Sequence, residues 1–210
     1  MFPEIVILLD TSLSIHKYIT FYVEGINYLI NTQKQINPRT RLTIIEFNNY
    51  IKLYCMNVAL ENIPVISPKD INVFGCTSLY DAIGYSIELK KYEKKPTIFI
   101  VITDGNDNYS KKYSNIDIIN IISKIPKNVF NFIYVGGDQD AKTEGNNLGI
   151  DNCIKFSSSN QSIKIVFDMI NRLINKLSYQ MTGDINMLSN INNVDIMDDV
   201  SDLFLNSLNI

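Results

Sequence analysis

Oxygen-bearing side chains alternate along the loop that follows the first apolar segment of the sequence. Asp10, Ser12 and Ser14 are each separated by one residue and come directly after the apolar run at 5–9. A carboxylate and hydroxyls are hard oxygen donors, which suit Mg²⁺ better than the nitrogen and sulfur ligands favoured by zinc. The same residue types also cap helices, so this pattern taken alone favours capping.

Two more oxygen donors occupy corresponding places later in the sequence. Thr77 lies in the loop that enters the second predicted helix, and Asp104 lies at the end of the strand that begins at Thr97. In a parallel sheet these loops meet the first loop at the carboxyl edge. Three separated groups of oxygen donors that meet at one edge of the sheet are much harder to obtain by chance than one. We therefore expect a metal site made of Asp10, Ser12, Ser14, Thr77 and Asp104.

The surrounding sequence alternates between apolar strands and periodic helices. Strands are predicted at 4–9, 42–47, 51–60, 97–103, 129–135 and 153–156, and helices at 16–32, 79–89, 116–125 and 159–177. The turn at Asn48 and Asn49 indicates an antiparallel hairpin at one edge, and residues 138–149 are expected to form a polar loop. Strands that alternate with helices are typical of a mainly parallel sheet covered on both faces. The predicted fold class is a doubly wound, Rossmann-like α/β fold with a six-stranded sheet and one antiparallel edge strand.

Charge divides the sequence into a body at 3–177 and a tail at 178–210. No Lys or Arg follows Lys176, whereas the tail contains Asp184, Asp195, Asp198, Asp199 and Asp202. Apolar residues recur in the tail near helical spacing, at Val194, Met197, Val200, Leu203, Phe204 and Leu208. This spacing indicates an acidic amphipathic helix. The tail either folds back on its own domain, stays disordered or docks on a partner, including the metal site of a second copy.

The three polar elements resemble the metal-ion-dependent adhesion site of the von Willebrand factor A family, which is written DxSxS, then Thr, then Asp. Asp10, Ser12 and Ser14 match the first element, Thr77 within 75–82 matches the second, and Asp104 within 102–105 matches the third. The segments 132–141 and 148–150 resemble intracellular, prokaryote- and phage-type members of that family. Leu13 replaces the usual middle Gly, which removes no ligand. The resemblance covers about 3–177.

The resemblance implies a binding module and not an enzyme. Members of the family hold Mg²⁺ or Mn²⁺, with Ca²⁺ less suited, and bind an acidic side chain of a protein partner at an open coordination position. Mg²⁺ takes about six oxygen donors and readily keeps waters, which is compatible with such a position. The alternatives are a Mg²⁺-dependent hydrolase or phosphotransfer enzyme and a structural assembly domain with a silent site. An enzyme would need a base or nucleophile near the cation, and the sequence offers no clear one.

Bulk composition excludes other classes of partner. The net charge of −3 gives no broad positive field for nucleic acid. No stretch approaches the ~20 apolar residues of a membrane span. The three cysteines form no CxxC pair, and the first apolar run lacks the basic residues of a signal peptide. A cytoplasmic protein is therefore expected, and its oligomeric state stays open.

Other metal and phosphate motifs fail at defining positions. An EF-hand starting at Asp104 would have Tyr109 where Gly is required and Asn115 where Glu is required. A haloacid-dehalogenase-type site would need Asp where Ser12 stands, and no GxxxxGK[ST] loop occurs. His16 is the only histidine, and we expect it on the surface of the first helical turn.

Four further residues near the predicted site are not counted among the metal ligands. Asp81 either supports the metal-binding hydroxyls or serves the start of its helix. Cys76 is expected to be a small packing residue. Asp138 and Asp140 are expected to belong to a solvated loop rather than to the rim of the site.

Overall fold

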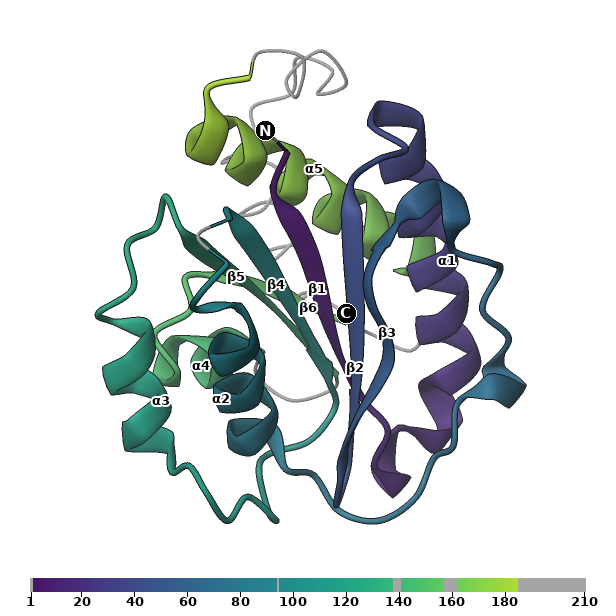
Figure 1. Ribbon diagram of the computed structural model, residues 1–210. Helices are drawn as coiled ribbons and strands as arrows, with labels where there is room; N and C mark the ends of the chain where they lie inside the picture. Colours follow the sequence, from purple (N-terminus) through teal and green to yellow (C-terminus); the bar gives the residue numbers. More distant parts are fainter. Residues whose placement is uncertain (1, 94, 138–140, 157–161, 185–210) are drawn as a thin grey trace, which may run out of the picture.

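A six-stranded sheet lies between two layers of helices in the computed structural model, which describes residues 2–93, 95–137, 141–156 and 162–184 (Figure 1). The strands are β1 (Glu4–Asp10), β2 (Arg41–Phe47), β3 (Ile51–Ala59), β4 (Thr97–Thr103), β5 (Phe130–Gly136) and β6 (Asn152–Lys155). Their order is β3-β2-β1-β4-β5-β6, and all neighbours are parallel except the antiparallel β2 and β3. This architecture confirms the predicted fold class.

Helices cover both faces of the sheet. They are α1 (Ile19–Ile36), α2 (Leu79–Lys90), α3 (Asn115–Ile122), α4 (Ala141–Asn147) and α5 (Ser162–Thr182), with short 3₁₀ turns η1 (Leu13–Tyr18), η2 (Leu60–Asn62) and η3 (Pro68–Asp70). Successive side chains of a strand point to opposite faces. Ile7 and Leu9 of β1 accordingly pack in the core under α1 and α5, and Val6 and Leu8 pack in the core under α2 to α4. None of the described helices is long and apolar enough to cross a membrane.

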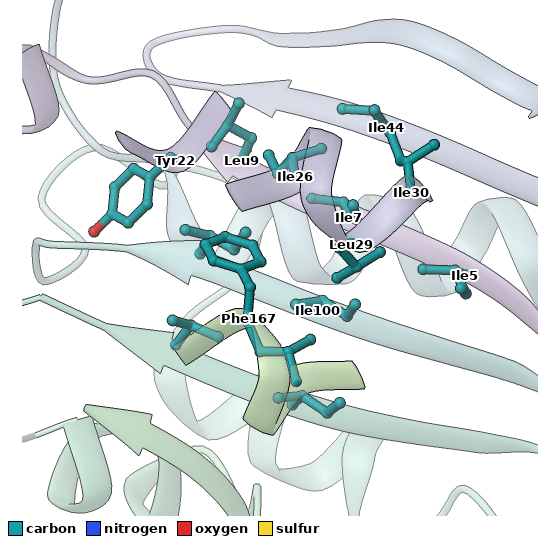
Figure 2. Packing of buried hydrophobic residues seen from close by; sticks show 14 of the residues in the cluster. Ile5, Ile7, Leu9, Tyr22, Ile26, Leu29, Ile30, Ile44, Ile100 and Phe167 are labelled. Carbon is teal, nitrogen blue, oxygen red and sulfur yellow. The ribbon is translucent and has the colours of Figure 1, made fainter. Parts of the chain in front are cut away.

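Helices α1 and α5 pack closely and run in the same direction. Figure 2 shows the ring of Phe167 among the apolar side chains of this core. A Cβ added to Gly25 would lie 1.8 Å from the Phe167 ring, so only glycine permits this approach. Further along both helices, the Gln33 amide donates hydrogen bonds to Asn171 at 2.9 Å and to Asn175 at 3.2 Å. Both helices therefore run from the carboxyl edge of the sheet toward the edge where the parallel strands begin.

The expected polar loop at 138–149 is wrong in part, because residues 141–147 form α4. This helix has the sequence AKTEGNN and lacks an apolar stripe that would reveal it. Its position depends on distant contacts, since a Cβ added to Gly145 would meet Cys153 of β6 at 2.2 Å and Tyr134 of β5 at 3.2 Å. Tertiary packing, and not local periodicity, makes this segment helical.

Two helix boundaries also differ from the expectation. The predicted first helix begins as η1, and α1 proper starts at Ile19; His16 is exposed in η1, as expected. The closing helix continues past 177 to Thr182, and Ser178 is buried. The amphipathic helix predicted for the tail lies outside the described residues, which end at 184.

Candidate metal centre

The predicted site lies where β1 and β4 end side by side. Asp10 is the last residue of β1, and Asp104 directly follows β4, the parallel neighbour of β1. The Ser14 hydroxyl donates a 2.7 Å hydrogen bond to Asp104 Oδ1. Ser12 Oγ lies 3.0 Å from Ser14 Oγ. The structure thus brings the first and third sequence elements into direct contact.

The second element reaches the same place through Thr77. A Cβ built on Gly105 would lie 3.5 Å from Thr77 Oγ1 and 3.6 Å from Ser14 Oγ, so both hydroxyls face this glycine. Thr77 is buried, whereas Ser14 is exposed. The predicted donors therefore form one oxygen cluster that extends from the protein interior to the surface.

Asp10 is a buried carboxylate held by neutral donors. Its Oδ1 accepts a 2.7 Å hydrogen bond from the Ser12 backbone N–H, and its Oδ2 accepts one of 2.6 Å from the Thr103 hydroxyl. Burial raises the pKa of Asp10 to about 6; these hydrogen bonds lower it in part, and nearby Asp104 raises it further. No Lys or Arg of the described residues pairs with Asp10.

This donor set fits a hard divalent cation. A buried carboxylate without a basic partner is costly unless a positive charge compensates it. The described residues contain no group of three or more His, Cys, Asp or Glu side chains that could hold a metal. Hydroxyls must therefore complete any coordination shell here, and the combination of hydroxyls with carboxylates suits Mg²⁺ and not zinc or copper.

The loop after β4 forms hydrogen bonds with both the N–H and the carbonyl of Thr77. Asn108 Oδ1 accepts a 2.8 Å hydrogen bond from the Thr77 N–H, and the N–H groups of Asn108 and Tyr109 each donate to the Thr77 carbonyl at 3.0 Å. Asn108 was not predicted as part of the site, because the sequence of this polar stretch was interpreted only as an incomplete EF-hand. The structure makes Asn108 the residue that ties the Thr77 loop to the Asp104 loop.

The same loop caps the N-terminus of α2. The N–H of Tyr80 donates to Asp107 Oδ1 at 3.2 Å, and the N–H of Asp81 donates to Ser110 Oγ at 3.0 Å. In return, the Asp81 carboxylate accepts hydrogen bonds of 2.9 Å from the backbone N–H groups of Lys111, Lys112 and Tyr113. Asp81 therefore supports the loop backbone rather than the metal-binding hydroxyls.

Close backbone packing at Asp104 requires a glycine that the predicted site did not include. A Cβ added to Gly137, which follows β5, would lie 2.7 Å from Asp104 Cβ and 3.0 Å from its Cα. The Gly137 N–H also donates to the Thr103 carbonyl at 3.0 Å. Gly137 was interpreted only as part of a turn, and its contact with Asp104 places it beside the site. Asp138 and Asp140 lie outside the described residues.

The segment before Thr77 runs beside the DxSxS loop. The Leu13 N–H donates to the Gly75 carbonyl at 3.0 Å, and the Leu13 side chain is 64% exposed. Because that side chain points to solvent, replacement of the usual glycine by leucine crowds no donor. Cys76 is exposed, so the expectation of a packing residue is wrong. Gly75 has φ of 75° and admits the Asn49 side chain, which accepts from the Cys76 N–H at 2.5 Å.

Solved structures that resemble this one include three proteins with von Willebrand factor type A domains or related names. The ArnB paralog VWA2 from Sulfolobus acidocaldarius aligns with a TM-score of 0.61 and 20% identity, over 80% of this chain and 44% of that chain. A von Willebrand factor type A protein from Catenulispora acidiphila aligns with a TM-score of 0.59 and 14% identity, over 85% and 42%. The vWF domain of the type V pili tip protein Mfa5 from Porphyromonas gingivalis aligns with a TM-score of 0.61 and 9% identity, over 84% and 96%. This chain has the fold of a von Willebrand factor type A domain.

The vWA fold confirms the resemblance at the level of architecture. No protein-family model matches the sequence, and a comparison with curated proteins gave no match. The chain spans less than half the length of the first two of these solved chains. Because one fold serves many functions, the fold alone does not determine what this chain binds.

Proposed function

We propose that this chain is a metal-dependent protein-binding module. It holds one Mg²⁺, or Mn²⁺ in its place, through Asp10, Ser12, Ser14, Thr77 and Asp104. Ca²⁺ suits the site less well. The ion, when bound, supplies an electron-poor coordination position for a carboxylate of a protein partner. The observation that carries this proposal is the Ser14–Asp104 hydrogen bond, with the Ser12 hydroxyl beside Ser14 and the hydroxyls of Ser14 and Thr77 both near Gly105. Beside them lies the buried Asp10 carboxylate, with which no Lys or Arg of the described residues pairs.

The balance of charge at the site favours an acidic ligand. The hydroxyl donors are neutral, so two carboxylates just balance the charge of a divalent cation, and the metal-loaded site has no net negative charge to repel a further carboxylate. Ser14 is exposed and Asp104 is half-buried, so a partner reaches the cluster from their side. Asp10 and Thr77 are buried and form the inner side of the oxygen cluster. The arrangement combines a fixed interior with an accessible surface, as a binding site requires.

A catalytic role is the competing function. Metal-dependent hydrolysis needs a base or nucleophile in addition to the cation. The hydrogen bonds that define this site join hydroxyls, carboxylates and backbone amides. One structural neighbour is a domain of a pilus tip protein, which also fits a role in binding. We therefore propose a module that is not an enzyme.

The cytoplasm is the proposed location. Cys55 and Cys76 are free thiols. Unpaired thiols, one of them exposed, are typical of a reducing compartment. Labelling of free thiols in the protein isolated from its own cells tests this proposal, and recovery of a disulfide-bonded form would contradict it.

Isothermal titration with Mg²⁺, Mn²⁺ and Ca²⁺ tests the metal site. The native chain should bind one Mg²⁺ or Mn²⁺, and Asp10→Asn should abolish binding because it removes a charge without changing the shape of the side chain. Asp151→Asn is the matched control, since Asp151 is exposed and pairs with Lys127. Equal Mg²⁺ binding by native and Asp10→Asn proteins would refute the ligand assignment.

Paramagnetic relaxation tests the open position separately. At the same total Mn²⁺ concentration, acetate methyl protons should relax faster with the native chain, which binds the ion, than with Asp10→Asn, which leaves it in solution. Acetate represents the side-chain carboxylate of a partner. If Mn²⁺ binds but acetate relaxation does not change, the site holds metal without recognising carboxylates, and a structural role would replace the binding role.

A further inference from the structure

Apolar side chains stand exposed beside the candidate metal centre. Leu13, Tyr50 and Phe74 are 64%, 71% and 38% exposed, and we call them the apolar rim. The Tyr50 and Phe74 rings lie 6.3 Å apart between centroids. The Phe74 N–H donates to the Thr11 carbonyl at 2.9 Å, which holds the Phe74 segment against the DxSxS loop. The rim is therefore assembled from three separate segments.

The apolar rim and the metal-binding cluster form one surface. Leu13 lies between two of the proposed ligands, Ser12 and Ser14, and its own side chain points outward. Exposed apolar groups that gather next to a polar centre are typical of sites that bind another protein. A ligand that fits this surface has a carboxylate for the cation and apolar side chains next to it for the rim.

The C-terminal segment 194–208 of this chain has that chemistry. Its acidic residues are Asp195, Asp198, Asp199 and Asp202, and apolar residues stand directly beside them, as in Asp202, Leu203 and Phe204. All 19 Lys and Arg residues precede this segment, which carries no positive charge to oppose a cation. Exposed Lys111 adds positive charge on the loop that contacts Thr77: its Nζ lies 3.3 Å from the Tyr109 hydroxyl, and the backbone N–H of Tyr109 donates to the Thr77 carbonyl. The segment and the site are complementary in charge.

The segment is long enough to reach the site. The α5 helix ends at Thr182 near the beginning of β1, which is the edge of the sheet opposite the site (Figure 1). A strand of seven residues such as β1 spans about 23 Å. When extended, residues 185–194 span up to roughly 33 Å and residues 185–202 up to roughly 60 Å, both longer than the strand. The segment can therefore reach its own site or that of a second copy.

We infer that residues 194–208 of this chain are a ligand of its own metal centre. An aspartate of the segment occupies the open coordination position, and neighbouring apolar side chains pack on Leu13, Tyr50 and Phe74. This inference rests on the proposed function, because it requires the bound cation. Its consequence is regulation, since an external acidic partner has to displace the segment before it binds.

Hydrogen–deuterium exchange on the full chain tests the inference. Mg²⁺ should slow amide exchange within 194–208 by about tenfold or more relative to chelator. The slowing should disappear in Asp10→Asn and in a variant with Asp195, Asp198, Asp199 and Asp202 all changed to Asn. Leu13→Asn should reduce it while still binding Mg²⁺. Tyr92→Asn is the matched control, because Tyr92 is 80% exposed, follows α2 and does not belong to the rim.

The outcomes separate this inference from the proposed function. If the native chain binds Mg²⁺ and exchange in 194–208 does not change, the inference is overturned and the metal site stands. If titration shows no metal binding, the proposed function is wrong, and the inference that rests on it fails with it. Protection that is lost on dilution supports binding to a second copy, and protection independent of concentration supports binding within one chain. Equal loss in Leu13→Asn and Tyr92→Asn would overturn the role of the rim.

Discussion

Asn108 Oδ1 accepts a 2.8 Å hydrogen bond from the backbone N–H of Thr77. This bond joins the loop after β4, which begins with Asp104, to the loop that carries Thr77 into α2. Two more hydrogen bonds, from the N–H groups of Asn108 and Tyr109 to the Thr77 carbonyl, hold the same peptide from its other side. The position of one proposed ligand therefore depends on a side chain that is not itself a ligand.

Replacement of Asn108 should weaken metal binding without removing a ligand. Asn108→Ala leaves the Thr77 N–H without its acceptor, so Thr77 loses its fixed position. Loss of such a supporting contact costs about 10- to 100-fold in metal affinity. Titration with Mg²⁺ measures the effect, and Asn106→Ala, an exposed neighbour in the same loop, is the control. Unchanged affinity in Asn108→Ala would mean that Thr77 is held by other contacts or is not a ligand.

Removal of the Thr103 hydroxyl should destabilise the ionised Asp10 carboxylate directly. Thr103→Val keeps the shape of the side chain but removes the 2.6 Å hydrogen bond to Asp10 Oδ2. A buried carboxylate that loses a donor is destabilised by about 1 to 3 kcal/mol, and its pKa rises further. Urea unfolding above pH 7 without metal should show this loss. Thr97→Val, at the other end of β4, is the control, because Thr97 bonds only to the Lys95 carbonyl among side-chain contacts of the described residues. A similar loss of stability in both variants would contradict the special role of Thr103.

Metal affinity should depend on pH through Asp10. The pKa of Asp10 without metal is about 6, because burial disfavours its charged form. The cation binds the ionised carboxylate, so protons compete with metal below this pKa. The apparent Mg²⁺ affinity should fall by up to about tenfold for each pH unit below 6 and change little above it. Titration at pH 5, 6, 7 and 8 measures the profile, and a flat profile would show that Asp10 does not bind the ion.

The stability of the metal-free chain should depend on pH in the opposite direction to metal affinity. The folded-state pKa of Asp10 is raised from 3.8 to about 6, so the folded chain binds this proton more tightly than the unfolded chain does. The contribution of Asp10 to stability is therefore largest below pH 4 and is lost as pH rises through 6, by at most roughly 3 kcal/mol. In chelator, Asp10→Asn should be more stable than the native chain at pH 7, and this advantage should disappear near pH 4. Urea midpoints of both proteins check the difference, and an advantage that is the same at both pH values would contradict it.

A core substitution should separate the fold from the site. Gly25→Ala places a methyl group within 1.8 Å of the Phe167 ring, so α1 and α5 must move apart. Overpacking of this kind costs about 1 to 3 kcal/mol. Phe167→Leu in the same chain should restore part of the stability, and Mg²⁺ affinity should stay within twofold of the native value. Thermal unfolding checks the rescue, and its absence would mean that the Phe167 ring is not what limits this position.

Local patterns in the sequence determined the framework of this protein. The strand at Thr97–Thr103 was predicted with both of its observed ends, because a continuous apolar run bounded by polar residues is a local signal. The parallel order followed from the alternation of strands with helices. Asp10, Ser12, Ser14, Thr77 and Asp104 were selected because each stands at a strand end or a helix start, which in a parallel sheet share one edge. The structure brings these residues together, and their role as ligands stays a proposal.

Only the tertiary structure decided how those residues are held. Thr103 bonds to Asp10 across 93 positions of sequence, and Asn108 bonds to Thr77 across 31. Asp81 likewise accepts a hydrogen bond from the backbone of Lys111, and Gly137 packs against Asp104, in both cases across a long stretch of sequence. Hydrogen bonds and steric contacts over such separations leave no periodic trace, so no local pattern predicts them. Short segments of the sequence determine which residues carry the oxygen donors. The distances between these donors, their burial and the raised pKa of Asp10 arise only when the chain folds.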